Sequence, residues 1–403
     1  MQNVFNTLER RGYVEQLTHP EEIKKLFEKE CVPFYIGIDP TADSLHVGHF
    51  ISLMVASHMQ KAGHKPIILM GGGTAIIGDP SGKTDMRKML TVEDIDNNVA
   101  QIKKQIEKFL SFEGPNAAII VNNGDCLRDL NYINFMREIG VHFSVNRMLA
   151  AECYKNRLET GLTFFELGYM LMQSYDFLYL HDHYGCKLEM GGNDQWSNII
   201  GGVELIRKIG AEDAYGFTFK LLTTKEGKKM GKTEKGALWL NPEKTSPYEF
   251  YQYWRNVADD DIENVMKLLT FIDVDEIEEM TKYKDERINE AKRRAAFEIT
   301  KLVHGEEAAI KAEEATKAMF EGKGNVEAME STKVEAGCTI TEALVNAGIA
   351  PSKGQAKTLI SQGAISLNDE KIDDIAYVLK EEDFKEGYAI LRKGKKIYHK
   401  LTK

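Results

Sequence analysis

The most constraining feature of this sequence is an alternation of short apolar runs with longer amphipathic stretches through its first half. The apolar runs have the length of buried strands and fall at residues 34–39, 66–70, 117–121 and 186–190. Apolar residues at helical spacing mark the stretches 46–61, 92–112, 130–139, 163–181 and 194–209. Such alternation predicts an α/β fold with a Rossmann-like, doubly wound parallel sheet, whose ligands bind outside the carboxyl ends of the strands.

The pattern changes beyond Pro247. Stretches with helical spacing follow at residues 248–257, 260–270, 274–284 and 287–304, with no strand pattern between them. Residues 321–336 have little periodicity and are typical of a linker. The sequence therefore predicts a helical domain, a linker and a further small C-terminal unit at residues 337–403.

Composition bears on the compartment and on the partners. There is no run of about 18 apolar residues, so we expect neither a signal peptide nor a membrane span, and a cytoplasmic protein. The five cysteines are scattered without a C-x-x-C pair, and we expect them to be reduced packing residues. The net charge of −10 argues against polyanion binding over the whole surface, but the last thirteen residues carry six basic residues and no acid. This tail is a candidate phosphate contact, with a solvated terminus as the alternative.

The first informative motif is His46-Val47-Gly48-His49, which follows a predicted strand and opens a predicted helix. Backbone N–H groups at a helix start favour an anion, and the two histidines would flank it. Gly48 removes a side chain, so a flat group such as adenine could approach the backbone. A buried or metal-binding histidine pair is the alternative, although no acidic or thiol ligand is placed to complete a metal site.

The second motif is Lys228-Lys229-Met230-Gly231-Lys232-Thr233, a basic loop that could close on a triphosphate. Alone, it could equally be a solvated lysine turn. Together, H-x-G-H near the start of a nucleotide-binding fold and K-M-G-K-T far downstream resemble the two signatures of class I aminoacyl-tRNA synthetases. Gly231 stands where the generic loop carries serine.

Further segments narrow the resemblance to the bacterial-type tyrosyl-tRNA synthetases, over nearly the whole chain. They are Tyr35-Ile36-Gly37-Ile38-Asp39-Pro40-Thr41, Tyr169-Met170-Leu171-Met172-Gln173-Ser174-Tyr175-Asp176 and Gly191-Gly192-Asn193-Asp194-Gln195-Trp196. The resemblance implies a ligase that activates tyrosine with ATP and then transfers it to the terminal ribose of its tRNA.

The resemblance also implies which residues bind tyrosine. Asp79, Tyr169 and Gln173 would hold its ammonium group, while Tyr35 and Asp176 would meet its phenol hydroxyl. Independently of the family, positions 169, 173 and 176 share one face of a helix and can converge on a small ligand. An exposed polar helix face is the alternative for these three residues.

For ATP, the family pattern implies two sets of residues. A set around the nucleotide and the reacting groups comprises Gly37, Asp39, Thr41, His46, His49, Gly191, Gly192, Asp194, Gln195 and Met230, with Gln195 also assigned to tyrosine. A second set of loop residues would clamp the pyrophosphate and comprises Lys83, Arg87, Lys229, Lys232 and Thr233. Magnesium is expected to accompany ATP, with no tightly bound protein metal.

One departure from the family lies at Glu189, where several relatives carry glutamine. This strand residue is expected to face the phenol pocket near Asp176, and two nearby carboxylates could share a proton.

The family also implies a division of the chain. Residues 1–222 would form the catalytic domain with an inserted dimerisation segment, 223–247 the signature loop and its connection, 248–320 a helical anticodon-side domain, and 321–336 the linker. Residues 337–403 would be an S4-like RNA-binding domain, because residues 341–357 resemble its helix, turn and helix, with Gly348 ending one helix and Ser352 capping the next. Eleven basic against nine acidic residues give this unit a net charge of +2, which favours tRNA contact there.

The partners expected are therefore tRNA(Tyr), tyrosine, ATP and a second copy of the chain. A homodimer is expected because the family pairs around Phe164, although Phe164 and Phe165 could equally be monomer core. Three other readings stay open: a nucleotidylyltransferase, a tryptophanyl-tRNA synthetase, and an RNA-binding paralogue that has lost catalysis.

Overall fold

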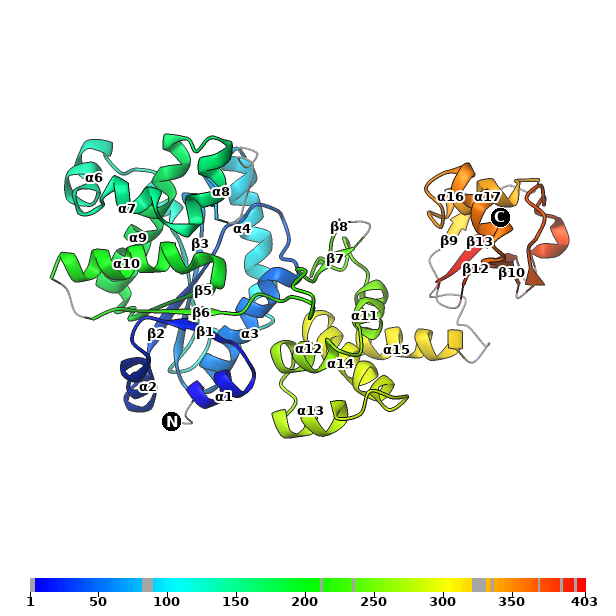
Figure 1. Ribbon diagram of the computed structural model, residues 1–403, viewed down its shortest axis with the longest axis horizontal. Coiled ribbons are helices and arrows are strands. Elements are labelled where there is room, and N and C mark those ends of the chain that lie inside the picture. Colours follow the sequence, from blue (N-terminus) through cyan, green and yellow to red (C-terminus); the bar gives the residue numbers. More distant parts are fainter. Residues whose placement is uncertain are drawn as a thin grey trace. The chain divides into compact units, whose positions relative to one another are not determined.

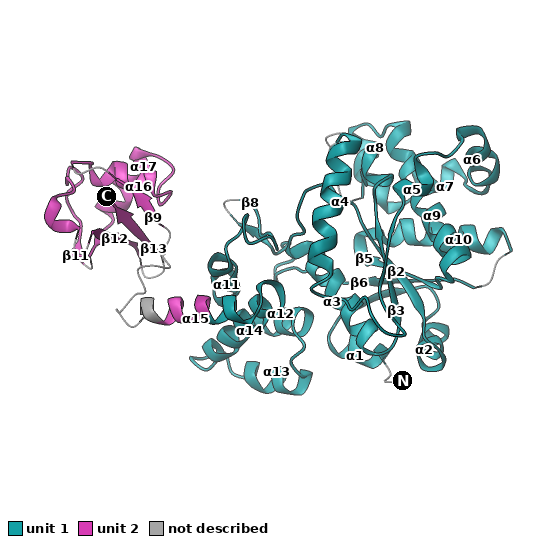
Figure 2. Ribbon diagram, turned by 180° about the vertical axis from the view of Figure 1, so that it is seen from behind, with its two compact units in different colours: residues 1–310 teal, residues 311–403 magenta. Residues whose placement is uncertain are grey.

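A computed structural model describes residues 4–81, 90–210, 213–233, 236–320, 331–334, 337–368, 370–384, 387–394 and 397–403, apart from the side chains of residues 318–320 and 397. The chain divides into two compact units, residues 1–310 and residues 311–403 (Figure 2). None of the described helices is long and apolar enough to cross a membrane.

The first unit is built on a six-stranded sheet in the order β1-β6-β5-β2-β3-β4. Its strands are β1 (Val14–Leu17), β2 (Pro33–Ile38), β3 (Lys65–Met70), β4 (Ile119–Asn122), β5 (Leu188–Gly192) and β6 (Tyr215–Phe219). Strands β2 to β6 are parallel, so the predicted Rossmann-like sheet is confirmed. The edge strand β1 runs antiparallel to β6 and was not predicted, because Val14–Leu17 is only four residues long and half-exposed.

Helices cover both faces of this sheet (Figure 1). On one face, α9 (Phe164–Tyr184) and α10 (Trp196–Lys208) pack around Tyr35, Ile67 and Leu69, which alternate along β2 and β3. On the other, α3 (Val47–Lys61) packs against β2 and β3. The remaining helices of this region are α1 (Val4–Arg10), α2 (Pro20–Lys29), α4 (Val92–Ile106), α5 (Gly124–Leu127), α6 (Tyr132–Glu138), α7 (Val145–Leu149) and α8 (Glu152–Thr160), with 3-10 turns at Thr74–Ile76, Gly140–His142 and Asn193–Gln195.

The same unit contains the predicted helical stretch and the short hairpin before it. The hairpin strands are β7 (Lys232–Thr233) and β8 (Gly236–Ala237), and the helices are α11 (Pro247–Arg255), α12 (Ile262–Leu269), α13 (Val274–Thr281) and α14 (Ile288–His304). The buried Arg11 guanidinium donates to the backbone carbonyl of Lys267 in the last turn of α12 at 2.9 Å. It also donates to the carbonyl of Thr270, directly after this helix, at 2.8 Å. Charge-assisted donors on otherwise orphan carbonyls tie these helices to the N-terminal segment.

Helix α15 (Glu306–Phe320) leads into the second unit, which is described by itself. Its five-stranded sheet has the order β11-β10-β12-β13-β9, and its helices are α16 (Ile340–Asn346) and α17 (Lys353–Ser361). The strands are β9 (Ser331–Lys333), β10 (Ile365–Leu367), β11 (Glu370–Lys371), β12 (Tyr388–Lys393) and β13 (Ile397–Thr402), with a 3-10 turn at Glu381–Asp383.

Gly348 and Ser352 lie between the two helices of the second unit and have the roles that the sequence predicts. Gly348, just after α16, has a φ of +66°, and the Ser352 hydroxyl accepts from the Gln355 amide at the start of α17. Residues 331–333, assigned to the linker above, form β9, which pairs in parallel with β13. Residues 321–330 and 335–336 of that linker lie outside the described part of the chain.

Candidate active site

The predicted site residues gather around one cavity of about 560 Å³ at the carboxyl ends of the parallel strands. Its lining includes Tyr35, Gly37, Asp39, Thr41, His46, His49, Asp79, Tyr169, Gln173, Asp176, Gly191, Gly192, Asp194, Gln195, Lys229, Met230 and Lys232. Of the predicted residues that the structure describes, Thr233 does not join them: it is exposed on β7, where its hydroxyl donates to the Gly236 carbonyl. The predicted residues Lys83 and Arg87 lie outside the described part of the chain.

Helix α9 presents the predicted trio to the cavity. The Tyr169 hydroxyl donates to Asp39 Oδ2 at 2.9 Å, and Gln173 Nε2 donates to Glu189 Oε1 at 2.9 Å. Tyr169 and Asp176 are buried, so the alternative of an exposed polar face is excluded. The three side chains line one binding cavity from one helix face.

The closed end of the cavity carries polar atoms that are buried and unsatisfied. Among the described residues, Tyr35 Oη and Asp176 Oδ1 have no hydrogen-bond partner, and Tyr35 is 1% exposed. Buried polar atoms are nearly always paired in folded proteins, because an unpaired one loses its hydration without compensation. A donor–acceptor pair of this kind fits a ligand that can both accept from the phenol of Tyr35 and donate to the carboxylate of Asp176.

Asn123 was missed by the sequence analysis and is central to this end of the pocket. Its side-chain amide donates to Asp176 Oδ2 at 2.7 Å and to Thr74 Oγ1 at 3.1 Å. Burial raises the pKa of Asp176 well above its usual range, and the Asn123 hydrogen bond opposes that shift. Asn123 directly follows β4, and Thr74 begins the 3-10 turn after β3, so the rule that ligands bind at the carboxyl ends of parallel strands could have found both.

Glu189 lies on β5 directly beside Tyr35 of β2, in the parallel register of the two strands. It is 1% exposed, and its Oε2 has no hydrogen-bond partner among the described residues. Burial raises the pKa of Glu189 to about 7, opposed by the nearby Tyr35 hydroxyl and the Gln173 amide. Glu189 is therefore poised to exchange its proton near neutral pH because it is buried, and the sharing of a proton with Asp176 stays a prediction.

This raised pKa predicts a pH-dependent stability. The folded protein holds the Glu189 proton more tightly than the unfolded chain does, so its contribution is fully present at low pH and declines as pH rises toward 7. We expect Glu189→Gln to gain stability relative to the unsubstituted protein over that window, by roughly 3 kcal/mol at pH 8. Calorimetric unfolding of both proteins between pH 5 and 8 measures it, with Glu152→Gln on the surface of α8 as the control. A stability difference independent of pH would contradict the prediction.

A second polar network lies beside Tyr169. Asp79 Oδ2 accepts from Gln195 Nε2 at 2.6 Å, and Asp79 Oδ1 accepts from the Ser81 amide at 2.9 Å. Gln195 Oε1 in turn accepts from Asn198 Nδ2. These bonds hold the Asp79 carboxylate, which is 8% exposed, at the wall of the cavity.

His46 and His49 form the start of α3 rather than a metal pair. His46 Nδ1 accepts from the Gly48 amide, His49 Nδ1 accepts from the His46 amide, and the two rings stack with centroids 4.1 Å apart. Because both Nδ1 atoms accept, each ring carries its proton on Nε2. Gly48 is needed for this fold-back, since a Cβ there would lie 2.7 Å from the His46 ring. The glycine thus makes room for a histidine ring of the site itself.

The signature loop reaches the cavity from the other side. Lys229 Nζ lies 3.8 Å from Asp194 Oδ2, just beyond β5. Lys229, Met230 and Lys232 line the cavity, whereas the neighbouring Lys228 pairs with Glu226 at 3.0 Å. Two cations of the loop are therefore placed to meet an anion held near the start of α3.

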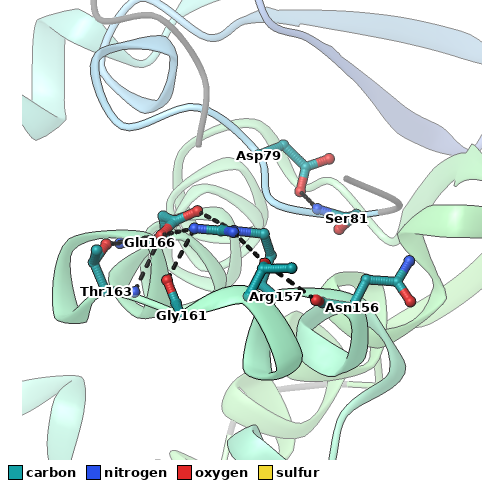
Figure 3. Close-up of polar contacts among 8 residues, drawn as sticks. Asp79, Ser81, Asn156, Arg157, Gly161, Thr163 and Glu166 are labelled. Carbon is teal, nitrogen blue, oxygen red and sulfur yellow. Dashed lines mark hydrogen bonds and ion pairs between the residues drawn. The ribbon is translucent and has the colours of Figure 1, made fainter. Parts of the chain in front are cut away.

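The start of α9 is fixed by a buried ion pair, drawn in Figure 3. Arg157 Nε donates to Glu166 Oε1 at 2.8 Å and Arg157 Nη2 to Glu166 Oε2 at 3.0 Å, with side chains 5% and 3% exposed. Arg157 Nη2 also donates to the Gly161 carbonyl, and the Thr163 hydroxyl caps the helix. The Arg157 guanidinium holds the pKa of Glu166 below its usual range. This bidentate contact fixes the position of the first turn of α9, the helix that carries Tyr169, Gln173 and Asp176.

Comparison with known proteins agrees with this geometry. Residues 28–321 match the family model of class I tRNA synthetases for tryptophan and tyrosine, and residues 321–401 match the C-terminal domain of tyrosine–tRNA ligases. The chain is 57% identical over its full length to a tyrosine–tRNA ligase of Acetivibrio thermocellus, covering 99% of that protein, and 59% identical to one of Caldanaerobacter subterraneus. The chain belongs to the tyrosyl-tRNA synthetase family. Its activity is that of a tyrosine–tRNA ligase of class I.

Solved structures of this family share the fold of the first unit. A C-terminally truncated mitochondrial tyrosyl-tRNA synthetase of Aspergillus nidulans matches 79% of the chain with a TM-score of 0.72 at 27% identity, covering 95% of that structure. A tryptophanyl-tRNA synthetase of Encephalitozoon cuniculi, at 13% identity and a TM-score of 0.55, shares the fold alone. Full-length identity to tyrosine–tRNA ligases therefore decides against the nucleotidylyltransferase and tryptophanyl alternatives.

Proposed function

We propose that Tyr35 and Asp176 recognise the phenol hydroxyl of tyrosine and that Asp79, Tyr169 and Gln173 hold its ammonium group. The observation that carries this is the pair of unsatisfied buried atoms, Tyr35 Oη and Asp176 Oδ1, at the closed end of the cavity. The phenol hydroxyl of the substrate can donate to the Asp176 carboxylate and accept from the hydroxyl of Tyr35, which satisfies both atoms. Phenylalanine would leave both buried and unpaired, which is the basis for rejecting it.

We infer that ATP binds between the start of α3 and the signature loop. His46 and His49 would meet the phosphates with their Nε2 protons, beside Gly37, Asp39, Thr41 and Asp194 of the cavity wall. The tyrosine carboxylate, steered by Gln195, then attacks the α-phosphorus in line, and pyrophosphate leaves toward Lys229 and Lys232. Since the nucleophile is already ionised, the residues position the reactants and stabilise developing charge.

Magnesium is proposed to arrive with the ATP phosphates. Among the described residues, no three His, Cys, Asp or Glu side chains gather as a set of ligands for a metal ion. Magnesium commonly takes most of its ligands from phosphate oxygens and water, so it does not require a set of three protein side chains. The ion would neutralise charge on the phosphates that the loop lysines also meet.

We propose a cytoplasmic homodimer that pairs through the segment 132–165. Large apolar side chains of this segment are exposed: Phe164 by 73%, and Ile133 and Val141 by 69% each. Phe164 is therefore not monomer core. Large apolar side chains exposed on one segment favour a protein partner, and a second copy is the partner that the family implies.

The second unit is proposed to bind tRNA away from the catalytic cavity, with residues 248–320 on the anticodon side. Its basic residues support this: Lys353 and Lys357 lie on α17, and Arg392, Lys393 and Lys400 lie on β12 and β13. Nine of its apolar side chains, among them Ile340 and Leu344, are fully buried, so the unit has a core of its own. A small domain that only aids solubility is the competing possibility.

Truncation after residue 320 tests this assignment. Tyrosine-dependent pyrophosphate exchange should survive, because the cavity lies wholly within residues 1–310. Transfer of tyrosine to tRNA should fall by on the order of 10²-fold, and the affinity of the intact enzyme for tRNA should weaken as salt rises. Exchange is the internal control for folding. A truncated enzyme that charges tRNA as well as the intact one would show that the unit is not a tRNA-binding element.

A further inference from the structure

The backbone of the signature loop is held at both of its ends. On the way in, the Met230 amide donates to the Leu222 carbonyl at 2.9 Å. On the way out, the Leu238 amide donates to the Gly231 carbonyl at 2.8 Å, and the Leu238 carbonyl accepts from the Val47 amide at 3.0 Å. These backbone hydrogen bonds therefore fix the loop to the start of α3, next to His46.

Gly231 is the point where the loop reverses. Its φ is +84°, and a Cβ there would lie 2.9 Å from the Cβ of Val47, so both the conformation and the space favour glycine. Gly231 is buried, and its amide donates to the hydroxyl of Tyr253 at 2.7 Å. A buried backbone N–H that lost this acceptor would be left without compensation for its lost hydration.

Tyr253 comes from a rigid element outside the loop. It lies on α11, whose start is fixed by a capping box between Ser246 and Glu249. The Tyr253 ring contacts the fully buried Trp254 edge to face, with centroids 5.0 Å apart. Burial raises the pKa of Tyr253, and the Gly231 amide opposes the shift, as expected for a phenol that accepts this hydrogen bond.

We propose that Tyr253 is a positioning residue for adenylate formation, whose hydroxyl fixes the loop at Gly231 so that Lys229 and Lys232 meet the leaving pyrophosphate. Gly231 lies directly between Met230 and Lys232, so a shift of its amide moves both lysines relative to Asp194. Tyr253 itself does not line the cavity. The inference rests on the proposed role of the two lysines.

The variant Tyr253→Phe tests this, because it removes only the hydroxyl and retains the ring packing against Trp254. Its kcat for tyrosine-dependent pyrophosphate exchange should fall roughly tenfold, with an unchanged KM for tyrosine. The matched control is Tyr283→Phe, a tyrosine that is 44% exposed before α14. A cooperative thermal unfolding transition that stays well above the assay temperature, together with the lowered kcat and the unchanged KM for tyrosine, separates positioning from loss of fold.

A double-mutant cycle with Lys232→Ala completes the test. If Tyr253 acts through the loop, Tyr253→Phe should change kcat by less than about twofold once Lys232 is gone. Losses that multiply independently, or an unchanged kcat in Tyr253→Phe, would overturn the inference. An unchanged kcat in Lys232→Ala alone would instead overturn the proposed role of the loop, so the two failures are distinguishable.

Discussion

Replacing Asp176 with alanine should lower kcat/KM for tyrosine by on the order of 10³-fold and remove most of the discrimination against phenylalanine. The carboxylate is the acceptor that we propose for the substrate hydroxyl, and its loss also leaves the Asn123 amide without its 2.7 Å partner. Rejection of phenylalanine by about 10⁵-fold is known for tyrosyl-tRNA synthetases, so the effect has a wide range in which to appear. Pyrophosphate exchange with each amino acid measures it.

The control for this substitution is Asp125→Ala, on the exposed side of α5 in the same part of the sheet. Asp176→Asn retains the shape of the side chain and separates loss of charge from loss of packing. Undiminished preference of Asp176→Ala for tyrosine over phenylalanine would show that the phenol is recognised elsewhere.

Removal of Lys229 or Lys232 should lower the rate of adenylate formation by on the order of 10²-fold, with tyrosine affinity nearly unchanged. Both side chains line the cavity, and Lys229 already lies 3.8 Å from Asp194. In the proposed mechanism their positive charge acts on the pyrophosphate as it leaves, so the ground-state complex with tyrosine should not depend on it. Pre-steady-state measurement of adenylate formation, with tyrosine binding measured separately, gives both quantities.

Lys228→Ala provides a matched control, since Lys228 is the adjacent lysine but pairs with Glu226 and does not line the cavity. Equal rates for Lys228→Ala, Lys229→Ala and the unsubstituted enzyme would remove the loop from the mechanism. Weakened tyrosine binding in Lys229→Ala would instead place that lysine in the ground-state complex.

The sequence predicted the parallel core of the fold because its strands are buried on both faces. The runs around β2 and β3 are continuously apolar, which distinguishes them from surface strands. Strand β1 was not predicted because it is a short edge strand, and its partner among the described strands, β6, is about 200 residues away in sequence. Because the partner strand is so far away in sequence, the residues around β1 do not themselves indicate the pairing.

For the site, motif spacing and family resemblance predicted the ligand-facing residues, but not what holds them. Asn123 follows β4 as a single asparagine in a turn, and only the neighbouring strands bring it to Asp176. The missing Cβ of Gly48 accommodates the His46 ring, which the sequence did not indicate, and its role in the approach of adenine stays a prediction. The contact between Gly231 and Tyr253 joins residues 22 apart on separate elements, and neither motif contains the tyrosine.

Pyrophosphate exchange by the intact enzyme with each of the twenty amino acids is the decisive measurement of tyrosine recognition. We expect exchange with tyrosine alone, because only tyrosine satisfies Tyr35 Oη and Asp176 Oδ1 together at the closed end of the cavity. Exchange with phenylalanine at a comparable kcat/KM, or with tryptophan in place of tyrosine, would contradict it, as would the absence of exchange with every amino acid.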